Sequence, residues 1–168
     1  MENPTYISAY RCFAKLGYAM CTISMDEAGM RPAELEKSGA DLAYIMPSHQ
    51  FPMGMVMPMK RRMQLLAWAS RENGRYLIED DYDSEFRYKG RPIPALQGND
   101  TEGKVIYLGT FSRAIAPSIR ISYMVLPEHL ANEFYRRLSF YSCTVSTFEQ
   151  YTLAPVSYTH LTLPTKLE

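Results

Sequence analysis

The chain has 168 residues, of which 18 are basic and 18 are acidic, so its formal net charge is zero. This length allows a single core that buries roughly 70% of the unfolded surface, and the charge balance excludes a field that would draw the whole chain onto nucleic acid or an anionic membrane. No apolar run approaches the ~20 residues of a membrane-spanning helix and the N-terminus lacks a signal layout, so we expect a soluble, cytoplasmic protein without a membrane partner.

The first half of the chain alternates helical and strand patterns. In chain order it predicts a helix over 4–16, a strand over 18–25, a short helix over 31–38 and a strand over 40–46. Asn3 and Pro4 mark the start of the first helix as a cap, and Gly17 ends it. The strand over 40–46 is a continuous apolar run, which is typical of a strand buried on both faces of a sheet.

The second half continues the alternation. In chain order it predicts a helix over 58–73, strands over 75–79, 104–109 and 119–126, and a helix from 127 onward with Leu130, Phe134, Leu138 and Tyr141 on one face. Helices between apolar strands indicate a parallel sheet, so the fold class is α/β and doubly wound. The strand over 119–126 follows its predecessor too soon for a helical crossover, and we therefore expect it to run antiparallel.

Several common site signatures are missing from the sequence. There is no glycine-rich phosphate loop of the dinucleotide or nucleoside-triphosphate type. Cys12, Cys21 and Cys143 are odd in number and widely spaced, which indicates neither a disulfide framework nor a CxxC metal site. We expect reduced, packed thiols and no metal site.

The last segment differs from the rest. Residues 156–168, VSYTHLTLPTKLE, have none of the periodicity of the preceding elements, and they resemble the translation of an adapter used in sequencing libraries. We therefore expect residues 1–155 to form part of a domain and residues 156–168 to be non-native and without function. The alternative is an ordinary polar C-terminal segment.

Three loops fall where a parallel sheet places its ligands. Ligands lie beyond the carboxyl ends of the strands, because the strand-to-helix loops converge there. The loops are 47–54 with PSHQFPMG, 79–85 within EDDYDSEFRY, and 110–120 within GTFSRAIAPSIR. Together they indicate one polar site far more specifically than any one of them does alone.

In order and spacing, these segments resemble the aminotransferase-like domain of MocR/GabR-type transcription regulators of the GntR family. Those bacterial proteins join a winged-helix DNA reader to a fold-type I domain that binds pyridoxal phosphate (PLP). The likeness runs from about Glu2 to Pro155 and includes ENPTY, RPIPALQG over 91–98, and ISYMVLP. It implies an incomplete fold-type I large domain, with a mostly parallel sheet flanked by helices.

The resemblance assigns roles to residues whose motifs match. Asp80 matches the acid that bonds the pyridine nitrogen and keeps it protonated, which makes the ring an electron sink. Tyr82 matches the phenol that bonds the ring hydroxyl. Thr110 and Ser112 offer hydroxyls to the phosphate, and Arg120 matches the arginine that binds it with two parallel donors. The alternatives are a solvated acid or metal ligand for Asp80, packing for Tyr82 and a surface ion pair for Arg120.

Position 113 departs from the family pattern. The pattern reads GTFSK, whose catalytic lysine forms a Schiff base with the cofactor aldehyde, and this chain reads GTFSR. Arg113 stays protonated at physiological pH and cannot form that imine. Lys104 begins its strand and so lies at the wrong end to replace the lysine. We expect PLP to bind noncovalently at best. Three explanations are open: a sequencing error, a natural variant that binds PLP noncovalently, or a degenerate pocket.

Two functions compete, and we favour the first. It is the PLP-binding effector or sensor part of a transcription regulator, catalytically impaired by Arg113, with an amino compound or vitamer as effector. This function implies DNA binding only through an N-terminal winged-helix domain, and a homodimer as the full-length protein. The second function is a fragment of a PLP-dependent aminotransferase, which needs the lysine that position 113 lacks. A third function, a metal-dependent phosphatase with its site in EDDYDSE, is not favoured, because the sequence has no motif for a nucleophilic partner.

Overall fold

The computed structural model describes residues 1–83, 94–113 and 118–156. The beginning of the RPIPALQG turn and the segment 157–168 lie outside these residues, so the expected non-native tail stays a prediction. The chain divides into two compact units, Met1–Ala131 and Asn132–Glu168. All the site residues expected from the sequence belong to the first unit.

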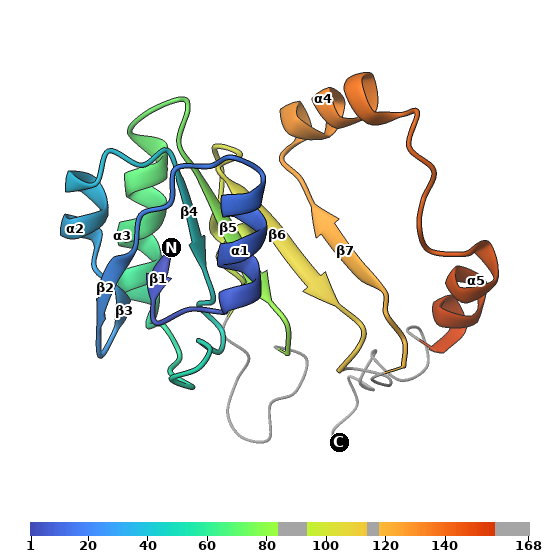
Figure 1. Ribbon diagram of the computed structural model, residues 1–168, viewed down its shortest axis with the longest axis horizontal. Coiled ribbons are helices and arrows are strands. Elements are labelled where there is room, and N and C mark those ends of the chain that lie inside the picture. The colour runs from blue at the N-terminus through green and yellow to red at the C-terminus, as the bar shows by residue number, and fades with distance from the viewer. Residues whose placement is uncertain (84–93, 114–117, 157–168) are drawn as a thin grey trace, which may run out of the picture. The chain divides into compact units, whose positions relative to one another are not determined.

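A four-stranded sheet in the order β4-β5-β6-β7 forms the centre of the first unit. Its strands are β4 (Leu42–Ile45), β5 (Tyr76–Asp81), β6 (Val105–Thr110) and β7 (Ser122–Val125). The first three run parallel, and β7 runs antiparallel to β6 (Figure 1). Ser122 of β7 lies opposite Thr110 of β6. The α/β class and the antiparallel return are confirmed.

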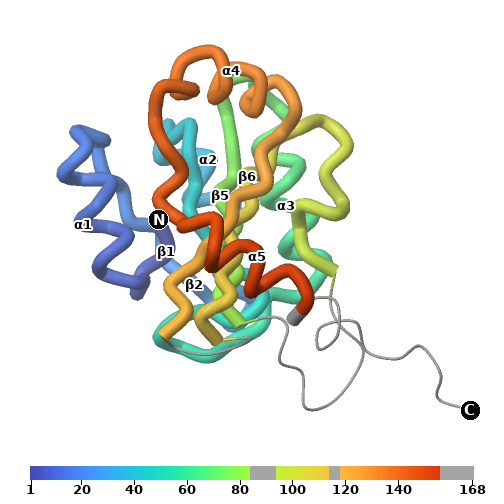
Figure 2. Tube along the Cα trace, turned by 90° about the vertical axis from the view of Figure 1, so that its right-hand side faces the viewer, coloured from blue at the N-terminus to red at the C-terminus, as the bar shows by residue number. Residues whose placement is uncertain are grey.

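Both faces of this sheet are covered by helices because its strands are apolar on both faces. In β4 and the residue after it, Ala43 and Ile45 belong to one core cluster, and Tyr44 and Met46 belong to the other, as the two-residue period of a strand requires. The helices are α1 (Ile7–Lys15), α2 (Pro32–Lys37) and α3 (Met59–Ser70). Figure 2 shows the sheet between α1 and α3.

The two clusters draw on different helices. The first buries side chains of α2 and α3 against the sheet, namely Leu35, Leu65, Trp68 and Ala69. The second packs partly buried side chains of α1, Ala9, Tyr10 and Phe13, against Tyr44 and Ile78. The site therefore lies on a sheet that is anchored from both sides.

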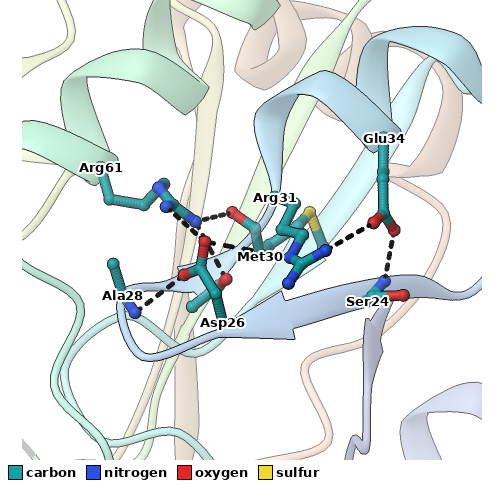
Figure 3. A network of polar contacts seen from close by, with 8 residues as sticks. Ser24, Asp26, Ala28, Met30, Arg31, Glu34 and Arg61 are labelled. Carbon is teal, nitrogen blue, oxygen red and sulfur yellow. Dashed lines mark hydrogen bonds and ion pairs between the residues drawn. The ribbon is translucent and has the colours of Figure 1, made fainter.

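A smaller sheet has the strand order β1-β2-β3, and an arginine of α3 binds it through hydrogen bonds and an ion pair. Its strands are β1 (Glu2–Asn3), β2 (Ile23–Asp26) and β3 (Gly29–Met30). Arg61 donates to the carbonyls of Gly29 and Met30 at 3.0 and 2.7 Å and pairs with the Asp26 carboxylate at 2.8 Å (Figure 3). Gly29 has φ +99°, and an added Cβ would meet Met57 Cε at 2.9 Å, so the tight β2–β3 turn requires glycine.

Some sequence expectations differ from the structure at element ends. The first helix begins at Ile7 instead of residue 4, because Glu2 and Asn3 pair with β2. The helix expected from 127 onward is α4 (Glu128–Leu138), which ends before Tyr141 and buries none of its residues. A further helix, α5 (Thr147–Val156), was not predicted. No helix within the described ranges is long and apolar enough to cross a membrane.

The three cysteines are free, as expected, but all three are exposed. The prediction that they pack inside the fold was therefore wrong. Their apolar character alone did not place them in a core, because the helix and loop positions that carry them face outward.

Candidate functional site

A cavity of about 450 Å³ lies at the carboxyl ends of β4, β5 and β6. All six residues selected from the sequence line it: Asp80, Tyr82, Thr110, Ser112, Arg113 and Arg120. Tyr6, Met46, Phe51 and Ser122 complete the lining. The three loops thus converge as the parallel topology predicts. The roles assigned to their residues by resemblance stay predictions.

Asp80 is the acid of this cavity, and its carboxylate is oriented by Tyr44. The Tyr44 hydroxyl donates a hydrogen bond to Asp80 Oδ2 from the adjacent strand β4. Burial raises the pKa of Asp80, and the bond from Tyr44 opposes that rise. Burial, followed by the nearby Asp80 charge, raises the pKa of Tyr44, so the phenol keeps its proton and acts as donor.

Arg113 lies at the edge of the cavity and is held by two contacts. Its Nη1 donates to Asp83 Oδ2 at 2.9 Å, and its Cζ lies 5.0 Å from the centroid of the Tyr82 ring. His49 Nδ1 approaches the same Asp83 oxygen at 2.6 Å, and the His49 ring stacks on Tyr82 at 5.8 Å. Four side chains from three loops therefore form one cluster, in which Asp83 is the shared anion.

The hydroxyls of Thr110 and Ser112 are engaged within their own hairpin. Ser112 Oγ donates to the carbonyl of Ile119 at 2.6 Å, and Thr110 Oγ1 lies 3.2 Å from the carbonyl of Ile121. The Ser112 amide donates to Thr110 Oγ1 at 3.2 Å. Either hydroxyl could donate a hydrogen bond to a phosphate only after its bond to the backbone carbonyl breaks. Arg120 thus becomes the more available phosphate ligand.

Arg120 and Arg113 differ in their pairing, although both line the cavity. Arg120 is exposed and makes no ion pair with any residue in the described ranges, whereas Arg113 is paired with Asp83. A guanidinium without a carboxylate partner at the carboxyl end of a parallel sheet suits a phosphate group.

The residues present fit PLP as a noncovalent ligand and do not fit it as a covalent one. A carboxylate, a phenol and the guanidinium of Arg120 face one cavity, but no described residue lining it is a lysine. Lys104 lies at the opposite end of β6, where its Nζ donates to the carbonyls of Glu72 and Asn73 at 3.0 and 3.1 Å. Lys104 thus lies at the end of β6 where it was expected, away from the cavity.

Sequence reasoning missed Tyr44 and Asp83. Tyr44 belongs to the apolar run 40–46, in which its hydroxyl was the sequence feature that could have indicated a polar role. Asp83 stood in the acidic cluster, whose members separate in the structure: Asp80 meets Tyr44, Asp81 accepts from Tyr107 at 2.9 Å, and Asp83 meets Arg113. The cluster therefore offers no common metal site among these three carboxylates.

Gln50 belongs to the loop 47–54 but does not line the cavity. Its Nε2 donates to the Pro4 carbonyl at 2.9 Å, and its Oε1 accepts from the Met53 amide at 3.0 Å. Gln50 is buried and shapes the loop. Its neighbour Phe51 faces the cavity instead and makes an edge-to-face pair with Tyr6, with 6.0 Å between ring centroids.

Solved structures with the same fold are PLP-dependent aminotransferases of fold type I. Kynurenine aminotransferase from Pyrococcus horikoshii superposes with a TM-score of 0.83 at 32% identity, covering 95% of this chain and 42% of that one. A multiple substrate aminotransferase from Thermococcus profundus gives 0.78 at 34% identity, covering 94% and 42%. The fold is thus that of an aminotransferase large domain.

Several curated proteins that are similar to this chain in sequence are transcription regulators. The HTH-type transcriptional regulator YdeL of Bacillus subtilis is 45% identical over 153 residues, which are 91% of this chain and 33% of YdeL. The probable rhizopine catabolism regulatory protein MocR of Rhizobium meliloti is 39% identical over 139 residues, 83% of this chain and 28% of MocR. No family model matches the chain. The chain belongs with the aminotransferase-like domains of MocR-type regulators, and it spans about a third of the length of the curated relatives it matches.

Proposed function

We propose that this segment is the effector-binding part of a MocR-type transcription regulator, whose cavity holds PLP, or PLP joined to an amino compound, without a covalent link to the chain. The observation that carries the proposal is the lining itself, which combines Asp80, Tyr82 and Arg120, for which the described residues offer no ion-pair partner, with Arg113 at the position expected for the anchoring lysine. When bound, PLP supplies an aldehyde that reacts with amines and an electron-withdrawing ring.

Each residue has a defined task in this proposal. Asp80 receives the pyridine nitrogen, Tyr82 donates to the ring hydroxyl, and Arg120 binds the phosphate, with Thr110 and Ser112 as secondary ligands. Arg113 remains protonated and is no nucleophile, so the residues bind and orient a ligand without turning it over.

The partners of the whole protein follow from its relatives. The names of several relatives describe HTH-type transcriptional regulators, among them the pyridoxine biosynthesis regulator PdxR of Corynebacterium glutamicum, 39% identical over 127 residues. We therefore assign DNA binding to an N-terminal winged helix outside this segment, and we place the protein in the cytoplasm as a homodimer. An amino compound or a vitamer is its effector.

Calorimetric titration of the full-length protein with PLP tests the binding proposal. We expect saturable binding, and we expect that borohydride reduction of the complex adds no cofactor mass to the chain. A cofactor fixed to wild-type protein would contradict noncovalent binding, and absence of any binding would contradict the PLP site.

The second candidate is an aminotransferase, which is supported by 34% identity over 159 residues to aromatic-amino-acid aminotransferase 1 of Thermococcus litoralis. That function requires an amine at position 113. Incubation of the PLP-loaded full-length protein with amino acids discriminates the two: amine transfer to the cofactor, followed by absorbance and product analysis, supports the enzyme, and its absence supports the regulator.

A further inference from the structure

We propose that Asp83 is a positioning residue that holds the Arg113 guanidinium on the Tyr82 ring and neutralises its charge, so that Arg120 is left as the cation for an anionic ligand. The ligand-dependent part of this inference rests on the proposed function. The geometric part concerns the chain alone.

The burial of the cluster identifies Asp83 as its organising group. The Asp83 side chain is 10% exposed, whereas those of its partners Arg113 and His49 are 59% and 46% exposed. A buried carboxylate is costly unless it is paired and hydrogen-bonded. Asp83 meets that requirement through one oxygen, which both partners approach within 2.9 Å.

A second contact determines where the guanidinium lies. Its Cζ is 5.0 Å from the Tyr82 centroid, within the range of a cation–π interaction. The His49 ring stacks on the same phenol with an interplanar angle of 21°. An exposed arginine side chain is otherwise free to rotate, so the combination of an ion pair and a ring contact restrains Arg113 where either contact alone would leave it mobile.

Two arginines in one cavity thus have different availability. Arg113 is engaged by Asp83, while Arg120 has no carboxylate partner among the described residues. A phosphate that enters the cavity competes with Asp83 for Arg113, whereas at Arg120 it competes with no carboxylate of the described ranges. Removal of the Asp83 charge would convert a cavity with one available cation into a cavity with two.

Chemical modification of the full-length protein tests the restraint without any ligand. Phenylglyoxal modification at Arg113 and at Arg120 would be followed by peptide mass spectrometry, with Arg120 as the internal reference. We expect the modification rate at Arg113 to rise severalfold in Asp83→Asn and to return toward the wild-type rate in Asp83→Glu. The rate at Arg120 should be the same in wild type and in both variants. Equal Arg113 rates in wild type and Asp83→Asn would overturn the proposal.

The same reaction on wild-type protein covers the case in which Asp83→Asn does not fold. At about 1 M salt the ion pair is screened, so the rate at Arg113 should rise relative to that at Arg120. A ratio that is independent of salt would overturn the restraint.

Titration with PLP and with inorganic phosphate tests the consequence for binding. Asp83→Asn should bind PLP roughly tenfold more tightly, the size of effect expected for one further unit charge beside a phosphate, and this gain should vanish when Asp83→Asn is combined with Arg113→Gln. A gain that persists in the double variant, or an unchanged affinity in Asp83→Asn, counts against the proposal. If PLP fails to bind wild type, the proposed function fails, while the modification rates still decide the role of Asp83.

Discussion

The hydroxyl of Tyr44 in β4 donates a hydrogen bond to the carboxylate of Asp80 in β5, across two parallel strands. The site acid is thereby connected to the packed core, because Tyr44 is 3% exposed and its ring contacts Phe13 of α1. The orientation of Asp80 consequently depends on a residue that does not line the cavity.

Replacement of Tyr44 by phenylalanine should weaken PLP binding about fivefold and reduce the free energy of unfolding by about 1 kcal/mol, the net contribution of one hydrogen bond. Calorimetry and urea unfolding measure the two effects. Tyr107→Phe is the matched control, since Tyr107 donates to Asp81 instead: it should lower stability similarly and leave PLP affinity unchanged. Equal losses of affinity in both variants would show a general effect on folding.

Replacement of Arg113 by lysine should restore covalent attachment of PLP. Lysine can lose its proton in a partly desolvated site and then react with the aldehyde, which arginine cannot do. After borohydride reduction, mass spectrometry should detect the cofactor on the Arg113→Lys chain and not on wild type. A variant that binds PLP but is never labelled would contradict the assignment of position 113 as the anchor.

Replacement of Arg120 by glutamine should weaken PLP binding at least about tenfold, because a charge-assisted bond to phosphate is lost. Pyridoxal, which carries no phosphate, should lose little affinity. Arg71→Gln provides a control, since Arg71 is an exposed arginine paired with Glu36 on the outside of the fold. Similar losses of affinity for PLP and for pyridoxal would show that Arg120 does not bind the phosphate.

Glu2 should make stability depend on pH. Burial raises the pKa of Glu2 to about 7, from 4.5, and its Oε1 is buried without a hydrogen-bond partner. Between these values the folded state retains a proton that the unfolded state has released. Stability is therefore fully present below about pH 4.5 and falls by up to about 3 kcal/mol as the pH rises to 7.

The Glu2→Gln variant checks this pH dependence, because an amide occupies the same space without a charge. Urea unfolding from pH 4 to 8 should give a flatter stability profile for Glu2→Gln and greater stability than wild type at pH 8. Parallel profiles for the two proteins would show that Glu2 does not titrate in this range.

The sequence alone determined the chain order of the four strands of the central sheet and the end of that sheet at which the site lies. Apolar runs marked β4, β5 and β6, the short connection after β6 required the antiparallel β7, and the carboxyl ends of parallel strands brought Asp80, Tyr82 and Arg120 to one cavity. These features follow from local periodicity and from the topology of parallel strands, both of which can be inferred from a single chain.

Only the tertiary structure decided which side chains meet. Tyr44 and Asp80 are 36 positions apart, His49 and Asp83 are 34 apart, and Arg113 and Asp83 are 30 apart. Their contacts depend on strand register and loop conformation, which periodicity does not specify. For the same reason, the sequence motif revealed an arginine at position 113 but not its partner. The pairing of Arg113 with Asp83, and the availability of Arg120 for an anionic ligand, arise from the packing of three loops at one edge of the sheet.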